Sequence, residues 1–259
     1  SLEAYETIMG GHPESVVTKT GRAEVLKALN RLPESLEAYE TIMEGHPGDV
    51  VAKTGRAEVL KALNRLPESL EAYETIMEEH PEDVFAKNGC SVVLVFMGDY
   101  QSALSYLSDV KPVTDQDWVG YHIKGMIHLN LGNLELAESI FQEGIRDNPN
   151  PRGKEFFHNA LALVRIKQKE YENAAQLLER VSSPDLQTTS NILRVYAFGA
   201  LGNRERARQA FMEITQQPSG VCLEFKEELR RRYLDEEEPV YDEEWLNESA
   251  MSCYLRMAA

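Results

Sequence analysis

The stretch at residues 35–68 reads SLEAYETIMEGHPGDVVAKTGRAEVLKALNRLPE, and residues 1–34 read almost the same. The two copies differ at only four positions. A third copy begins at Ser69 with SLEAYETIMEEHPEDVFAK and then diverges. A sequence that repeats every 34 residues is typical of stacked units, each made of a helix, a turn and a second helix. The repeat therefore predicts an all-α protein built as an array.

Each repeat divides into two helical halves. In the second full repeat, residues 52–63 contain no proline and predict one helix. Pro67 suits the first turn of a second helix, because its missing N–H would have no partner there anyway. That second helix is expected to end at His80, since the residue before a proline disfavours helical backbone. Two such short helices bury their apolar stripes only against stacked neighbours.

These features resemble the tetratricopeptide repeat family over residues 1–218. The repeat that starts at Trp118 matches best, with Tyr121, Gly125, His128, Gly132, Leu134, Ala137, Phe141, Gly144 and Pro149 at the family's positions. Asn64 and Lys169 depart from the pattern by replacing the turn glycine, and Ser69 replaces a small alanine. The resemblance implies a right-handed α-solenoid of antiparallel helix pairs. Its small residues let helices approach closely, and its aromatic residues fill the space between pairs.

The register predicts a half repeat at the start of the chain, followed by about six repeats. The six are expected to start at Val16, Val50, Val84, Trp118, Glu155 and Thr188. Residue 1 then falls inside a second helix, so we expect the sequence to be a fragment of a longer protein. Beyond Pro218 the pattern fails. Residues 219–259 predict a capping helix, which covers the last stack, then an acidic linker and a possible last helix.

Composition excludes several kinds of partner. The formal net charge is −16, from 27 basic and 43 acidic residues, which argues against a nucleic-acid partner because phosphates require a basic face. Three widely spaced cysteines form neither a disulfide framework nor a zinc pattern, so we expect a reducing, cytoplasmic location. The longest apolar run, residues 90–97, is too short to span a membrane.

The chain shows no motif that carries catalysis. A Ser-His-Asp order, a phosphate-binding glycine loop and a catalytic carboxylate pair are all missing from the sequence. His12, His46 and His80 recur one repeat apart, too far for a shared metal ion at about 2 Å per bond. We interpret them as exposed residues that end helices. The sequence predicts no enzyme, no metal and no cofactor.

The resemblance also implies where a ligand would bind, because family members usually hold ligands on the concave face lined by the first helix of each repeat. In the first two full repeats those positions are polar: Thr20, Glu24 and Lys27, then Thr54, Glu58 and Lys61. In the later repeats they become a largely apolar strip of Asn88, Val92, Val95, Phe96, His122, Met126, Leu129, Asn159, Leu163, Ile166, Ile192 and Tyr196. Such a strip suits a peptide or a partner helix. Alternatively, these side chains pack between helices, or residues 245–255 cover them.

We therefore expect a non-catalytic scaffold that presents a concave groove to a segment of a partner protein. One alternative is a regulatory or substrate-recruiting arm of a larger enzyme. A second alternative is self-association, because nearly identical terminal repeats could stack head to tail.

Overall fold

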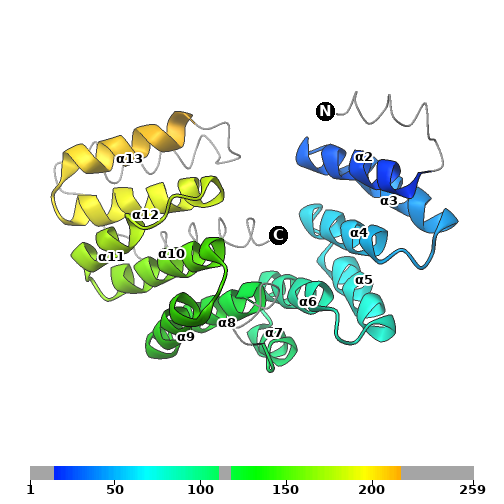
Figure 1. Cartoon of the computed structure of the whole chain (residues 1–259), viewed down its shortest axis with the longest axis horizontal. Helices are drawn as coiled ribbons and strands as arrows, with labels where there is room; N and C mark the ends of the chain where they lie inside the picture. Colours follow the sequence, from blue (N-terminus) through cyan, green and yellow to red (C-terminus); the bar gives the residue numbers. More distant parts are fainter. Residues whose placement is uncertain (1–14, 111–117, 217–259) are drawn as a thin grey trace. The chain divides into compact units, whose positions relative to one another are not determined.

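The computed structural model describes residues 15–110 and 118–216. Within them the backbone forms α-helices and one 3-10 turn, with no β-strand, so the predicted all-α helical-repeat solenoid is confirmed. The described residues fall into two compact units, residues 15–109 and residues 110–216. Each unit is a stack of antiparallel helix pairs (Figure 1). The predicted half repeat and the predicted elements of residues 219–259 lie outside the described residues.

Three helix pairs form the first unit, and each first helix contacts the next along the stack. Their bounds are α2 Val16–Ala28, α3 Leu32–Gly45, α4 Val50–Ala62, α5 Leu66–Glu79, α6 Val84–Met97 and α7 Tyr100–Tyr106. The apolar core lies between successive pairs and centres on Tyr39 and Ile42, then on Tyr73 and Ile76. Within this unit, α3 therefore packs against α4, and α5 packs against α6.

Three further pairs form the second unit around one larger core. Their bounds are α8 Trp118–Asn130, α9 Leu134–Asp147, α10 Pro151–Lys167, α11 Tyr171–Leu178, the 3-10 turn η1 Pro184–Leu186, α12 Gln187–Ala200 and α13 Arg204–Gln216. The core contains Phe141, Phe157 and Tyr196, each almost completely buried. Aromatic residues fill the space between helix pairs here, as the sequence predicts.

Capping side chains determine where the first helices of the first unit begin. Ser15, Asp49 and Asp83 each accept a hydrogen bond from the backbone N–H three residues later, at 3.4, 2.8 and 2.8 Å. Such a bond satisfies an N–H that has no partner within the helix. The helices start at Val16, Val50 and Val84. These are the predicted starts of the repeats.

One predicted start is wrong. The fifth repeat was expected to start at Glu155, but α10 begins one turn earlier, at Pro151. The Asn150 side chain accepts from the backbone N–H of Arg152 and of Gly153, at 2.9 and 3.4 Å. Proline suits the first helical position that follows such a cap. The 34-residue register counted from Trp118 falls at residue 152, so this local capping signal places the start of α10 within one residue of the register.

The turn between the two helices of a repeat has the same left-handed backbone in all six described pairs. Gly98, Gly132 and Gly202 have φ values of 81°, 77° and 71°. Asn30, Asn64 and Lys169 occupy the same place with φ values of 59°, 60° and 63°. Asparagine tolerates this conformation better than most residues, whereas lysine adopts it at a cost. The departures from the family's turn glycine thus preserve the turn.

Serine replaces the small alanine without opening the helix pair. Ser35 and Ser69 are fully buried, and their hydroxyls donate to the carbonyl oxygens of Ala23 and Ala57, at 2.8 Å in each case. A buried hydroxyl costs free energy unless it is hydrogen-bonded. The bond to the paired helix supplies that partner, so serine fits the position.

Candidate functional site

A row of exposed apolar side chains lies on the first helices of the first unit. Val17, Val51 and Phe85 each follow the first residue of their helix, and their side chains are 82%, 62% and 67% exposed. The same cap starts each helix, so these residues hold equivalent places one repeat apart. Because α4 contacts both α2 and α6, the three helices form a continuous surface. We call the surface of α2, α4 and α6 that carries these three residues the first-helix face.

Charged side chains follow the apolar row along the same helices. Lys27 of α2 pairs with Glu24 of its own helix at 3.0 Å and with Glu58 of α4. Glu24 also accepts a hydrogen bond from the hydroxyl of Tyr39. Lys27 therefore links two successive repeats through their carboxylates. The sequence predicts the pair within α2 from its spacing of three, but the link to Glu58 depends on the distance between helices and needs the structure.

Lys61 occupies the place in α4 that Lys27 occupies in α2, yet it forms no ion pair in the part of the chain that the structure describes. The residue that would correspond to Glu58 in the next repeat is Val92. Burial lowers the pKa of Lys61 to about 8; the charge of Glu58 opposes this shift, and the charge of Lys27 adds to it. Desolvation disfavours an ammonium group that no carboxylate neutralises.

The predicted groove residues of the first unit are mostly covered. Asn88, Val92 and Val95 are 9%, 2% and 5% exposed, whereas Phe96, near the end of α6, is 38% exposed. The side-chain oxygen of Asn88 is buried and accepts no hydrogen bond among the described residues. Of the four, Phe96 is the one that presents a large surface.

The predicted groove residues of the second unit are all buried. His122, Met126, Leu129, Asn159, Leu163, Ile166 and Tyr196 are at most 4% exposed, and Ile192 is 1% exposed. The amide of Asn159 is used between α10 and α12: it donates to the Thr189 hydroxyl and accepts from the Ser190 hydroxyl, each at 3.3 Å. The structure thus places these side chains in the packing of the unit, and their role in binding stays a prediction.

His122 lies among aromatic rings rather than at an open surface. Its ring centroid is 5.9 Å from that of Phe141, 5.9 Å from that of Phe156 and 5.7 Å from that of Phe157. Burial lowers the pKa of His122 to about 4, and a hydrogen bond with the backbone of Phe156 partly opposes the shift. The imidazole is therefore neutral at physiological pH, which suits packing rather than charge recognition.

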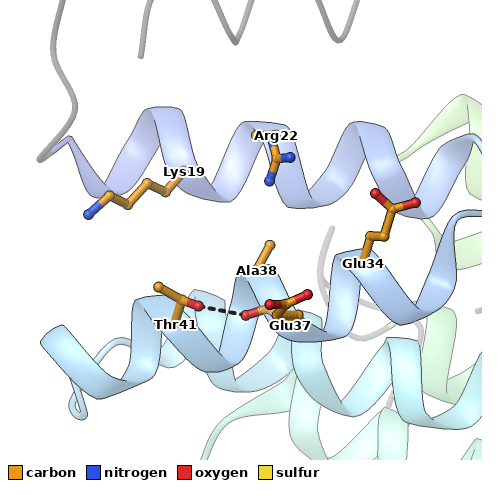
Figure 2. A pocket seen from close by; sticks show the side chains of 6 residues that line it. All are labelled: Lys19, Arg22, Glu34, Glu37, Ala38 and Thr41. Carbon is orange, nitrogen blue, oxygen red and sulfur yellow. Dashed lines mark hydrogen bonds between the residues drawn. The ribbon is translucent and has the colours of Figure 1, made fainter. Parts of the chain in front are cut away.

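A hollow of about 270 Å³ lies between α2 and α3. Figure 2 shows the side chains that line it: Lys19, Arg22, Glu34, Glu37, Ala38 and Thr41. The Thr41 hydroxyl donates to the backbone carbonyl of Glu37 at 2.9 Å. Among the described lining residues, cations and carboxylates occur in equal number, and none is an aromatic residue or an activated nucleophile. It therefore offers no chemistry beyond ordinary polar contact.

The described residues hold no group of three or more His, Cys, Asp or Glu side chains arranged for a metal ion. His46 and His80 end their helices as exposed residues, as predicted, whereas His12 lies outside the described residues. Burial raises the pKa of the Cys90 thiol to about 12, which suppresses its reactivity. Across residues 15–110 and 118–216, no helix has the length and apolar character needed to cross a membrane.

Comparison with known proteins agrees with the repeat architecture. The family model of the tetratricopeptide repeat matches residues 120–151. A tetratricopeptide repeat protein from Parabacteroides merdae has a similar structure, with a TM-score of 0.69 at 19% identity over 89% of this chain and 90% of that chain. No curated protein matches the chain. A tetratricopeptide repeat is thus recognised at residues 120–151, and the described part of the chain shares the fold of tetratricopeptide repeat proteins.

Other solved structures share the fold at still lower identity. PilW, a type IV pilus biogenesis factor, gives a TM-score of 0.62 at 16% identity over 83% of this chain and 99% of that chain. Human IFIT1, solved as a dimer with PPP-AAAA, gives a TM-score of 0.62 at 13% identity over 85% of this chain and 55% of that chain. At such identities the likeness concerns the fold alone. The fold supports a scaffold for protein–protein interactions, and the choice of partner depends on the surface of this chain.

Proposed function

We propose that this chain is a non-catalytic scaffold that holds a segment of a partner protein on the first-helix face. The observation that carries the proposal is the row of Val17, Val51 and Phe85, which repeats the same exposed apolar contact in three successive helices. Apolar surface that recurs at one register offers an elongated partner a series of equivalent contacts, and its burial is favourable.

Phe96 extends the candidate contact toward the other end of α6. Val92 and Val95 of α6 are buried, so they would support this surface through packing rather than touch the partner. A binding surface of this kind consists of rigid helices, so little conformational entropy is lost when a segment docks. The proposed partner is a peptide or a helix of another protein, and neither a nucleic acid nor a cofactor is required.

The proposal can be tested with peptides selected against the full chain from a displayed library of random sequences. Binding of a selected peptide is measured by fluorescence anisotropy. The double variant Val51→Asp, Phe85→Asp should weaken binding about tenfold or more, because two exposed apolar contacts are replaced by charges. Leu136→Asp, at a residue of α9 that is 47% exposed, provides the matched control and should leave the affinity unchanged. Equal binding by the double variant, with unchanged helical circular dichroism, would exclude the first-helix face.

A further inference from the structure

The lysine–carboxylate bridge that joins α2 to α4 is not repeated between α4 and α6. Lys27 bridges to Glu58, which lies 31 residues later, and the equivalent bridge from Lys61 would need a carboxylate at Val92. Val92 is instead apolar and 2% exposed. Lys27 therefore has a carboxylate partner in the next repeat, whereas Lys61, at the equivalent position, has none there.

Lys61 carries a cost that an external anion would relieve. Glu58, the carboxylate whose charge acts on Lys61, is engaged by Lys27, and Lys61 itself is partly buried. A partly desolvated cation without a partner is unfavourable, and a carboxylate at hydrogen-bonding distance restores the balance.

A second polar group, a hydrogen-bond acceptor without a donor among the described residues, lies on the neighbouring helix α6. The side-chain oxygen of Asn88 in α6 is buried and accepts no hydrogen bond in the described part of the chain. Such an oxygen can accept a hydrogen bond from a backbone N–H, which every residue of a peptide except proline carries. Asn88 lies three residues beyond Phe85 in α6, whereas Lys61 stands near the far end of α4. In the shared repeat register, Asn88 thus stands between the apolar row and the position of the lysine.

The spacing of these groups sets the length of the ligand. Val51 and Lys61 are ten residues apart in α4, which corresponds to about 15 Å along the helix axis. An extended chain covers that distance with about five residues. One segment can therefore reach both the apolar row and the lysine.

We propose that α4 and α6 bind an extended acidic segment, with a bulky apolar side chain against Val51 and Phe85 and a carboxylate on Lys61. This inference rests on the proposed function and adds the chemistry of the partner. The missing carboxylate at Val92 is supplied by the ligand, and the Asn88 amide oxygen receives one of its backbone N–H groups.

The test uses the full chain and two synthetic peptides, both acetylated and amidated: Leu-Leu-Ser-Ser-Ser-Glu-Glu and its neutral twin, Leu-Leu-Ser-Ser-Ser-Gln-Gln. NMR titration at low salt gives both dissociation constants. We expect the acidic peptide to bind about fivefold more tightly, the size of effect that a partly shielded ion pair produces. Lys61→Gln should abolish this preference, and so should Val92→Glu, which gives Lys61 an internal partner.

Lys87→Gln removes the same charge from α6 and provides the control, because the Lys87 ammonium pairs with Glu82 at 3.0 Å. This variant should keep the preference for the acidic peptide. The inference is overturned if neither peptide binds, if the twins bind equally, or if Lys61→Gln leaves their ratio unchanged. Binding without preference rejects Lys61 yet leaves the first-helix face standing, whereas failure of the Val51 and Phe85 test rejects that face itself.

Discussion

The ring of Tyr39 in α3 lies directly against Gly55 in α4, so closely that a Cβ atom on residue 55 would stand 2.3 Å from the ring carbon Cζ. Tyr39 is completely buried, so the ring has little room to move. The same relationship recurs one repeat later between Tyr73 and Gly89, at 2.4 Å. Close approach of successive repeats therefore depends on a residue without a side chain at this position.

Substitution of this glycine should destabilise the stack. Gly55→Ala forces the buried Tyr39 ring to shift, at a cost of about 1–3 kcal/mol that outweighs the gain of about 1 kcal/mol in helix propensity. Thermal unfolding followed by circular dichroism should show a lower midpoint. Gly45→Ala is the matched control: nothing lies within 4 Å of that Cβ, so the midpoint should stay or rise. A variant at Gly55 as stable as the wild type would contradict the packing described.

Lys169 should be a site of stored backbone strain. It adopts φ 63° at the place where three other repeats have glycine. Lys169→Gly should stabilise the protein by about 0.5–1 kcal/mol, because glycine adopts this conformation without a steric penalty. Urea unfolding checks the change. Gly132→Lys, the reverse exchange in the preceding repeat, should destabilise by a similar amount, and equal signs for the two exchanges would refute the interpretation.

Acid should weaken the second unit through His122. Its pKa is about 4 in the folded protein and 6.5 when unperturbed, so below pH 6.5 the unfolded chain binds the proton more readily. The contribution of neutral His122 to the free energy of unfolding is complete above pH 6.5. It is lost as the pH falls toward 4, by at most about 1.4 kcal/mol per pH unit. His122→Phe should flatten the dependence of unfolding free energy on pH over this range. Carboxylates titrate in both proteins, so only the difference between them is interpreted; parallel curves would contradict the assignment.

The sequence predicts the helix pairs because their signals are local. Caps such as Asp49, the prolines at the start of α3 and α5, and the turn position of Asn64 each act within a few residues. The early start of α10 is equally local, and Asn150 followed by Pro151 would have revealed it. These features require no knowledge of distant contacts.

The candidate site was harder to predict, because burial depends on how many helices surround a residue. α10 contacts α8, α9, α11 and α12, so a side chain such as Leu163 is covered from several directions that helical periodicity cannot distinguish. The exposed residues Val51 and Phe85 were not predicted, because the ligand positions that the family resemblance implies lie further along each helix. Their recurrence directly after the first helical residue of three repeats was the available signal.

The most direct test of the central claim is hydrogen–deuterium exchange of the full chain, with and without a saturating peptide selected by display. The first-helix face predicts added protection in segments covering α2, α4 and α6, and unchanged exchange in α3 and α5. Protection confined to α3 and α5, or to the second unit, would contradict the account.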